Sequence, residues 1–115
     1  MVSVLSFADT FDDVADAIKN GNVKEVSKYF SSSVELTVLD NEGIYSIPQA
    51  EIILKNFFTQ NPPKAVTINH RGSSAQGSKY AIATYECAKG KYRAYIFMKD
   101  SGSGIMIQEL RFEKE

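Results

Sequence analysis

In the last third of the chain, apolar and polar side chains alternate, which is typical of β-strands. The segment from Lys79 to Phe112 contains three such runs, each rich in Tyr, Ile and Phe. Gly-containing turns at Lys89-Gly90 and at residues 100–103 separate the runs. The pattern predicts an antiparallel meander of three strands, Lys79–Ala88, Lys91–Lys99 and Gly104–Phe112.

Upstream of the meander, apolar residues recur at the spacing of an amphipathic helix in three places. Ser46 followed by Gln49 resembles a capping box at the start of one helix, and Pro62-Pro63 prevents its continuation. Asn20-Gly21-Asn22 separates the other two helices, because Gly accepts the left-handed conformation and Asn caps the helix that follows. The predicted helices are Phe7–Lys19, Val23–Phe30 and Pro48–Gln60.

Three shorter runs complete the sheet: Val34–Leu39, a brief return at Ile44-Tyr45, and Lys64–Arg71. Apolar residues change parity within the last strand, which predicts a β-bulge near Gln108-Glu109 that bends the sheet. Helices followed by an antiparallel sheet indicate a single α+β domain over residues 1–115, with N-terminal helices packed on one face of a strongly bent antiparallel sheet.

Both faces of the meander carry apolar side chains, and three helices can cover only one face. Exposed apolar patches of this size are unusual on monomers, so the pattern favours a homodimer formed through the uncovered face. One face contains Ala81, Ala83, Tyr85, Ala94, Ile96 and Met98, and the other contains Tyr80, Ile82, Tyr95, Phe97 and Met106.

Composition excludes several classes of function. Lys and Arg number 13 against 14 Asp and Glu, so no net charge favours binding to nucleic acid or to anionic lipid. Cys87 is the single cysteine and His70 the single histidine, which excludes an intrachain disulfide and a structural zinc site, and no cofactor motif is present. Residues 1–6 are apolar but too few to span a membrane, and they are either a disordered lead or the remnant of a trimmed signal.

The candidate chemistry has a plain structural alternative in each case. His70 suits a general base because imidazoles titrate near neutral pH, or it is a strand histidine bonded to a neighbour. With Lys89-Gly90 as the turn, Glu86 lies opposite Arg93, and the two side chains either grip a polar ligand or form a cross-strand pair. The tyrosines either line a cavity or pack in the core and an interface. The pocket candidates are Tyr45, His70, Tyr85, Glu86, Tyr92, Arg93 and Tyr95.

The order of elements resembles the nuclear transport factor 2-like, or cystatin-like, cone fold. Within that superfamily the chain is similar to an uncharacterised bacterial family, a domain of unknown function usually exported behind a signal peptide. The segments that carry this resemblance are Asn56-Phe-Phe58, Pro62-Pro-Lys64, His70-Arg-Gly72, Tyr80-Ala-Ile82 and Tyr92-Arg-Ala-Tyr95. The resemblance implies a cone-shaped pocket and a periplasmic or otherwise exported protein. The acid, His or Tyr–Asp motifs of the superfamily's enzymes have no match here, so the resemblance assigns no catalytic residue.

These observations favour a non-enzymatic domain that dimerises through its sheet and binds a small apolar or mixed-polarity ligand or a protein partner. A second hypothesis is a small lyase or isomerase that uses His70 or Glu86 as its general base. A third is an accessory module whose cone is filled and has no pocket. The position of His70 and Glu86 relative to a closed cavity discriminates between the first two hypotheses.

Overall fold

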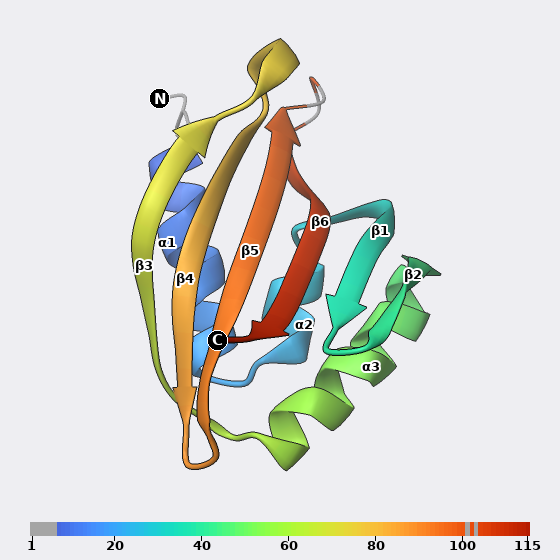
Figure 1. The fold of residues 1–115 in the computed structure, drawn as a ribbon. Helices are drawn as coiled ribbons and strands as arrows, with labels where there is room; N and C mark the ends of the chain where they lie inside the picture. The colour runs from blue at the N-terminus through green and yellow to red at the C-terminus, as the bar shows by residue number, and fades with distance from the viewer. Residues whose placement is uncertain (1–6, 101, 103) are drawn as a thin grey trace.

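The computed structural model describes residues 7–100, 102 and 104–115. The predicted lead at residues 1–6 and parts of the turn at 100–103 lie outside these residues. Within them, three helices and a short 3-10 turn, Ala75–Gly77, accompany six strands (Figure 1). The elements are α1 (Phe7–Lys19), α2 (Val23–Ser27), β1 (Phe30–Val38), β2 (Asn41–Ser46), α3 (Ile47–Gln60), β3 (Pro63–Ser73), β4 (Lys79–Cys87), β5 (Gly90–Asp100) and β6 (Ile105–Lys114).

The six strands form one curved sheet in the order β2-β1-β6-β5-β4-β3. This architecture confirms the α+β prediction of helices packed on a bent sheet. The sheet is mixed, not wholly antiparallel as predicted, because β1 pairs with β6 in parallel while every other pairing is antiparallel. After β2 the chain passes through α3 to β3 at the opposite edge of the sheet. The remaining strands then run back across the sheet, so the last strand, β6, lies next to β1.

Helices α1 and α3 match their predicted ranges to within one residue, and α2 is shorter than predicted. The Gln49 side chain accepts a hydrogen bond from the Ser46 N–H (3.2 Å), as the predicted capping box requires. Helix α2 ends at Ser27 because Phe30 already belongs to β1. The Ile107 N–H donates to the Tyr29 carbonyl (2.5 Å), which holds the chain in an extended form beside β6.

The predicted partition of the meander into two faces is confirmed. The inner face, which comprises Ala81, Ala83, Tyr85, Ala94, Ile96 and Met98, is buried beneath the helices. The open face, which comprises Tyr80, Ile82, Tyr95, Phe97 and Met106, is partly exposed. Figure 1 looks onto the open face, with α1 and α2 behind the strands.

The predicted register of the first hairpin is wrong by two residues. The turn is Ala88-Lys89, because Cys87 pairs with Gly90, and Gly90 has φ +134°, a conformation that favours glycine. A two-residue shift preserves the parity of the strand, so the faces were predicted correctly although the cross-strand partners were not.

β-Bulges in β6 and β3 change which face the strands present. In β6, Phe97 pairs with Glu109 and Met98 with Ile107, so Gln108 is the extra residue, as predicted. In β3, Ile68 pairs with Ala83 and His70 with Ile82, so Asn69 is a second, unpredicted bulge. Each bulge reverses the parity of the residues that follow it.

Candidate functional site

Aromatic side chains from α3 and the sheet pack together inside the cone. The Phe57 ring lies 5.4 Å from both Tyr85 and Tyr92 and 4.9 Å from Phe112, measured between ring centroids. Phe58 stacks on Tyr85 at 6.2 Å. All five side chains are buried. The sequence placed Tyr85 and Tyr92 among the candidates for lining a pocket, and the structure places both in this core.

The two tyrosine hydroxyls bind Asn61, which ends α3. Tyr85 donates a hydrogen bond to the Asn61 carbonyl, and Tyr92 donates to Asn61 Oδ1 (3.1 Å). Asn61 Nδ2 donates back to the Phe57 carbonyl (3.2 Å). Burial raises the pKa of the Tyr85 hydroxyl above its ordinary value, so this group remains a protonated donor at neutral pH. The network fixes the end of α3 against β4 and β5.

His70 and Tyr95 lie on the open face with Tyr80. His70 Nε2 is 3.3 Å from the Tyr80 hydroxyl, and the Tyr80 and Tyr95 rings stack at 5.8 Å. The prediction that His70 shares a side with Val66 and Ile68 is wrong, because the bulge at Asn69 turns His70 to the open face. His70 is exposed and lines none of the cavities described below.

Glu86 and Arg93 are not cross-strand partners, contrary to the sequence prediction. Glu86 pairs with Lys91 and Arg93 with Thr84, as the corrected turn requires. Neither side chain forms a hydrogen bond or ion pair with another residue in the described part of the chain. Glu86 and Arg93 are therefore not directly opposite each other, and the register of the hairpin does not depend on an ion pair between them.

Tyr45, the remaining candidate, lies on β2 and packs against the edge of the core. Its ring covers Gly43, where a Cβ atom would approach the ring to 3.0 Å. The seven predicted pocket residues are thus divided among the core, the open face and β2. The structure does not bring them together in one pocket.

An acidic group on the open face was not singled out from the sequence. Glu35 on β1 and Glu109 on β6 are partners in the parallel pairing. Burial, then the charge of Glu35, raises the pKa of Glu109, while Arg111 opposes the shift. The guanidinium of Arg111 binds Glu113 (3.0 Å) and lies 3.7 Å from Glu109. No sequence pattern pointed to this cluster, because it requires the parallel contact between β1 and β6.

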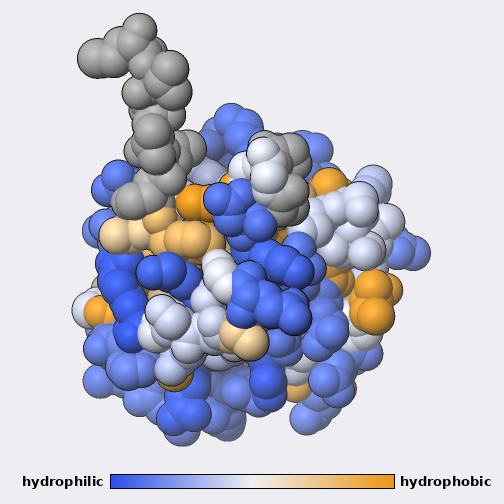
Figure 2. Space-filling view, turned by 90° about the horizontal axis from the view of Figure 1, so that it is seen from above, coloured by the Kyte–Doolittle hydropathy of each residue, from blue (hydrophilic) through white to orange (hydrophobic). Residues whose placement is uncertain are grey.

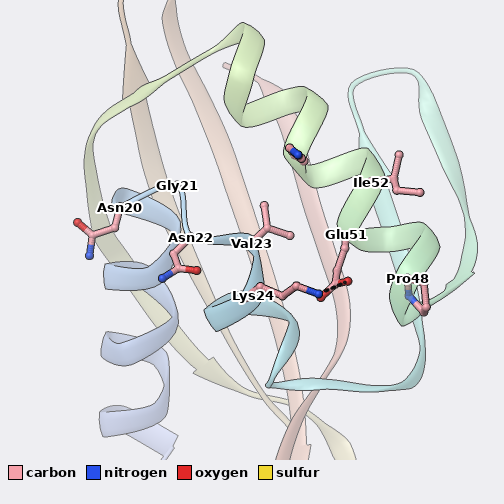
Figure 3. A pocket seen from close by; sticks show the side chains of 9 residues that line it. Asn20, Gly21, Asn22, Val23, Lys24, Pro48, Glu51 and Ile52 are labelled. Atoms are coloured by element: carbon pink, nitrogen blue, oxygen red, sulfur yellow. Dashed lines mark hydrogen bonds and ion pairs between the residues drawn. The ribbon is translucent and has the colours of Figure 1, made fainter.

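A groove between α2 and α3 was also missed. One cavity of about 650 Å³ is lined by Val23 and Lys24 on α2, by Glu51, Ile52 and Lys55 on α3, and by neighbouring residues. Figure 3 shows Val23 and Lys24 facing α3, with the Lys24–Glu51 ion pair (3.2 Å) across the gap. A second cavity of about 350 Å³ continues along α3 and shares Asn20, Gly21, Val23 and Lys55 with the first.

The rest of the surface is mainly polar from the direction shown in Figure 2. Outside the grey atoms, hydrophobic residues form separate patches among hydrophilic ones. None of the helices within the described ranges has the length and apolar character needed to cross a membrane. No group of three or more His, Cys, Asp or Glu side chains is placed to hold a metal ion among those same residues.

Comparison with known proteins identifies close relatives by structure. The chain is 27% identical to a DUF4783 family protein from Bacteroides ovatus ATCC 8483, with a TM-score of 0.83 over 90% of this chain and 93% of that one. It is also 27% identical to a DUF4783 family protein from Bacteroides fragilis YCH46, with a TM-score of 0.82 over 90% and 96% of the two chains.

A more distant structure shows the fold alone. It is an NTF2-like protein of unknown function from Cytophaga hutchinsonii ATCC 33406, 10% identical, with a TM-score of 0.68 over 97% of this chain and 92% of that one. No curated protein matches the chain. The model of the family described as "Domain of unknown function (DUF4783)" matches residues 11–113. The nuclear transport factor 2-like fold is therefore confirmed, and the chain belongs to the DUF4783 family.

Proposed function

We propose that this protein is a non-enzymatic interaction domain that pairs with a second copy of itself through the open face. The observation that carries the proposal is the row of half-buried aromatic and aliphatic side chains on β4, β5 and β6, which no helix covers. Half-buried rings such as Tyr95 and Phe97 lose their remaining contact with water when a partner covers them, and burial of apolar area stabilises association.

The charges on the open face suit a twofold-symmetric pair. Arg93 on β5 and Glu113 on β6 are cross-strand partners, as are Tyr95 and Arg111. A twofold axis parallel to the strands, between β5 and β6, lays β6 of each copy over β5 of the other at the same height. Each Glu113 then faces an Arg93 of the other copy, and each Arg111 faces a Tyr95 ring. The same contact occurs twice, so opposite charges meet on both sides of the axis.

The packing of the cone supports binding over catalysis. The two candidate bases, His70 and Glu86, lie on β3 and β4 outside the cavities described above. A general base needs a substrate held within hydrogen-bond reach. Inside the cone, where the enzymes of the superfamily hold their substrates, Tyr85 and Tyr92 pack against Phe57 and donate hydrogen bonds to Asn61.

Sedimentation velocity tests the proposal. We expect wild-type protein at micromolar concentration to sediment with twice the monomer mass of 12.8 kDa. Phe97→Glu places a carboxylate opposite Glu109 of the other copy, because Phe97 and Glu109 are cross-strand partners, and should give a monomer that remains folded, because Phe97 is partly exposed. Ile52→Glu changes an exposed residue of α3, away from the open face. It is the matched control and should leave the dimer intact. A monomeric wild-type protein, or a dimer that survives Phe97→Glu, contradicts the proposal.

A further inference from the structure

We infer that the groove between α2 and α3 is a binding site for a small amphipathic carboxylate, an organic acid that carries an alkyl chain. The groove lies among the helices, away from the open face, so the inference does not depend on the proposed dimer. It rests on the continuity of two cavities, on the apolar side chains along them, and on one cation that has no partner among the described residues.

Apolar side chains line part of the groove along α3, beside polar and charged ones. Ile52 is 63% exposed and borders the first cavity. Phe58 and Pro62 line the second cavity, and Val23 borders both. A helix rises about 1.5 Å per residue, so the stretch from Ile52 to Thr59 offers roughly 10 Å of surface. Ligand sites of this kind are concave and mostly apolar, with few polar groups.

The charges of the groove favour an anion. The Glu51 carboxylate is already engaged, since it accepts hydrogen bonds from Ser27 (2.6 Å) and Lys24 (3.2 Å). These two hydrogen bonds lower the pKa of Glu51 and keep it ionised at neutral pH. Lys55 lines both cavities, and its ammonium group binds no other residue in the described part of the chain. Lys24 and Lys55 therefore outnumber Glu51, and Lys55 is free to pair with a ligand carboxylate.

The geometry of α3 places these features together. Pro48, Glu51, Lys55 and Thr59 recur every three or four residues, so they lie along one side of the helix. On the facing side, Gly21 has φ +65° and allows the chain to turn sharply between α1 and α2. The groove is thus bounded by a regular helix and a tight turn, and Lys55 stands where the two cavities meet.

Three probes of equal chain length separate charge from apolar contact: octanoate, 1-octanol and octylammonium. Each is titrated into ¹⁵N-labelled protein while amide chemical shifts are recorded. We expect octanoate to shift the signals of the groove, from Asn20 to Lys24 and from Ile52 to Thr59, and to bind more tightly than 1-octanol. Octylammonium should bind most weakly. Equal binding of octanoate and octylammonium, or shifts spread elsewhere, overturns the inference.

Two variants test whether Lys55 supplies the positive charge that binds the carboxylate. Lys55→Glu should weaken octanoate binding at least tenfold and strengthen octylammonium binding. Lys55→Met keeps the apolar stem, so it should bind octanoate and 1-octanol equally. Lys89→Glu, on the exposed turn between β4 and β5, makes the same charge change outside the groove and should leave octanoate binding unchanged. Octanoate affinity that falls equally in Lys55→Glu and Lys89→Glu reflects net charge alone and contradicts the site.

Discussion

Removing one hydroxyl from the core tests the role of the Tyr85–Asn61 contact. Tyr85 is fully buried, and its hydroxyl donates to the Asn61 carbonyl at the end of α3. The change Tyr85→Phe keeps the ring and therefore its contacts with Phe57 and Phe58. What changes is the partner of the Asn61 carbonyl, which no longer receives this hydrogen bond.

The expected cost follows from the burial of that carbonyl. A buried acceptor left without its partner costs about 1–3 kcal/mol. Unfolding entropy is about 2.1 cal/mol/K per residue, or roughly 0.24 kcal/mol/K for a chain of 115 residues. The melting temperature should therefore fall by about 4–12 °C. The loss should concentrate at the end of α3, because Asn61 joins that end to β4.

Urea denaturation and thermal melts followed by circular dichroism measure the change. Tyr80→Phe is the matched control, since the Tyr80 hydroxyl lies on the open face 3.3 Å from exposed His70. We expect the control to alter the free energy of unfolding by less than about 0.5 kcal/mol. If both variants lose the same stability, the hydrogen bond to Asn61 does not hold the end of α3, and this account of the core is wrong.

Three further changes test other contacts. Because burial and Glu35 raise the pKa of Glu109 above 4.5, the native state binds this proton more readily than the unfolded chain, so stability falls as pH rises from 4.5 through the raised pKa. Glu109→Gln should therefore raise the free energy of unfolding at pH 7 and flatten that pH dependence in urea titrations, and a lower stability at pH 7 would contradict this. Gly72→Ala would drive a Cβ atom into the Tyr80 ring and should cost about 1–3 kcal/mol in urea denaturation, and an unchanged midpoint would show that the ring moves freely. Asp12→Asn removes the ion pair with Arg71 (2.6 Å), and since both side chains are well exposed, the loss should be at most about 1 kcal/mol and should vanish at high salt.

The sequence was sufficient to predict those features of the fold that depend on local periodicity. Helix α1 and the division of the meander into two faces follow from the spacing of residues that are adjacent in sequence. The hairpin register was harder to predict, because Lys89-Gly90 and Ala88-Lys89 are both plausible two-residue turns. Only the conformation of Gly90, which serves as the first strand residue, decides between them.

The candidate site depended on contacts between distant segments, which periodicity does not report. Tyr85 and Tyr92 lie on the inner face in either interpretation, so the pattern alone could not tell a cavity wall from a filled core. The deciding residue is Asn61, a buried polar side chain placed where α3 meets both strands. The closeness of Glu35 and Glu109 likewise required the parallel pairing of β1 with β6.

The two bulges explain why the sequence prediction put His70 on the wrong face of the sheet. Since His70 lies on the open face, its signals can report on changes there. The bulge at Gln108 is visible in the sequence because apolar residues lie on both sides of it and change parity. After Ile68 come Asn69, His70 and Arg71, all polar, so a change of parity leaves no apolar trace. The bulge sends Arg71 toward α1, where it binds Asp12, and sends His70 beside Tyr80.

As the single histidine, His70 gives one resolvable pair of imidazole proton signals. If copies pair through the open face, these signals should shift as the protein is diluted through the dissociation range, and they should stay constant in monomeric Phe97→Glu. Octanoate should leave them unchanged, because the groove between α2 and α3 lies among the helices on the other side of the sheet. Imidazole signals that respond to octanoate but not to dilution would contradict both the proposed dimer face and the proposed binding site between α2 and α3.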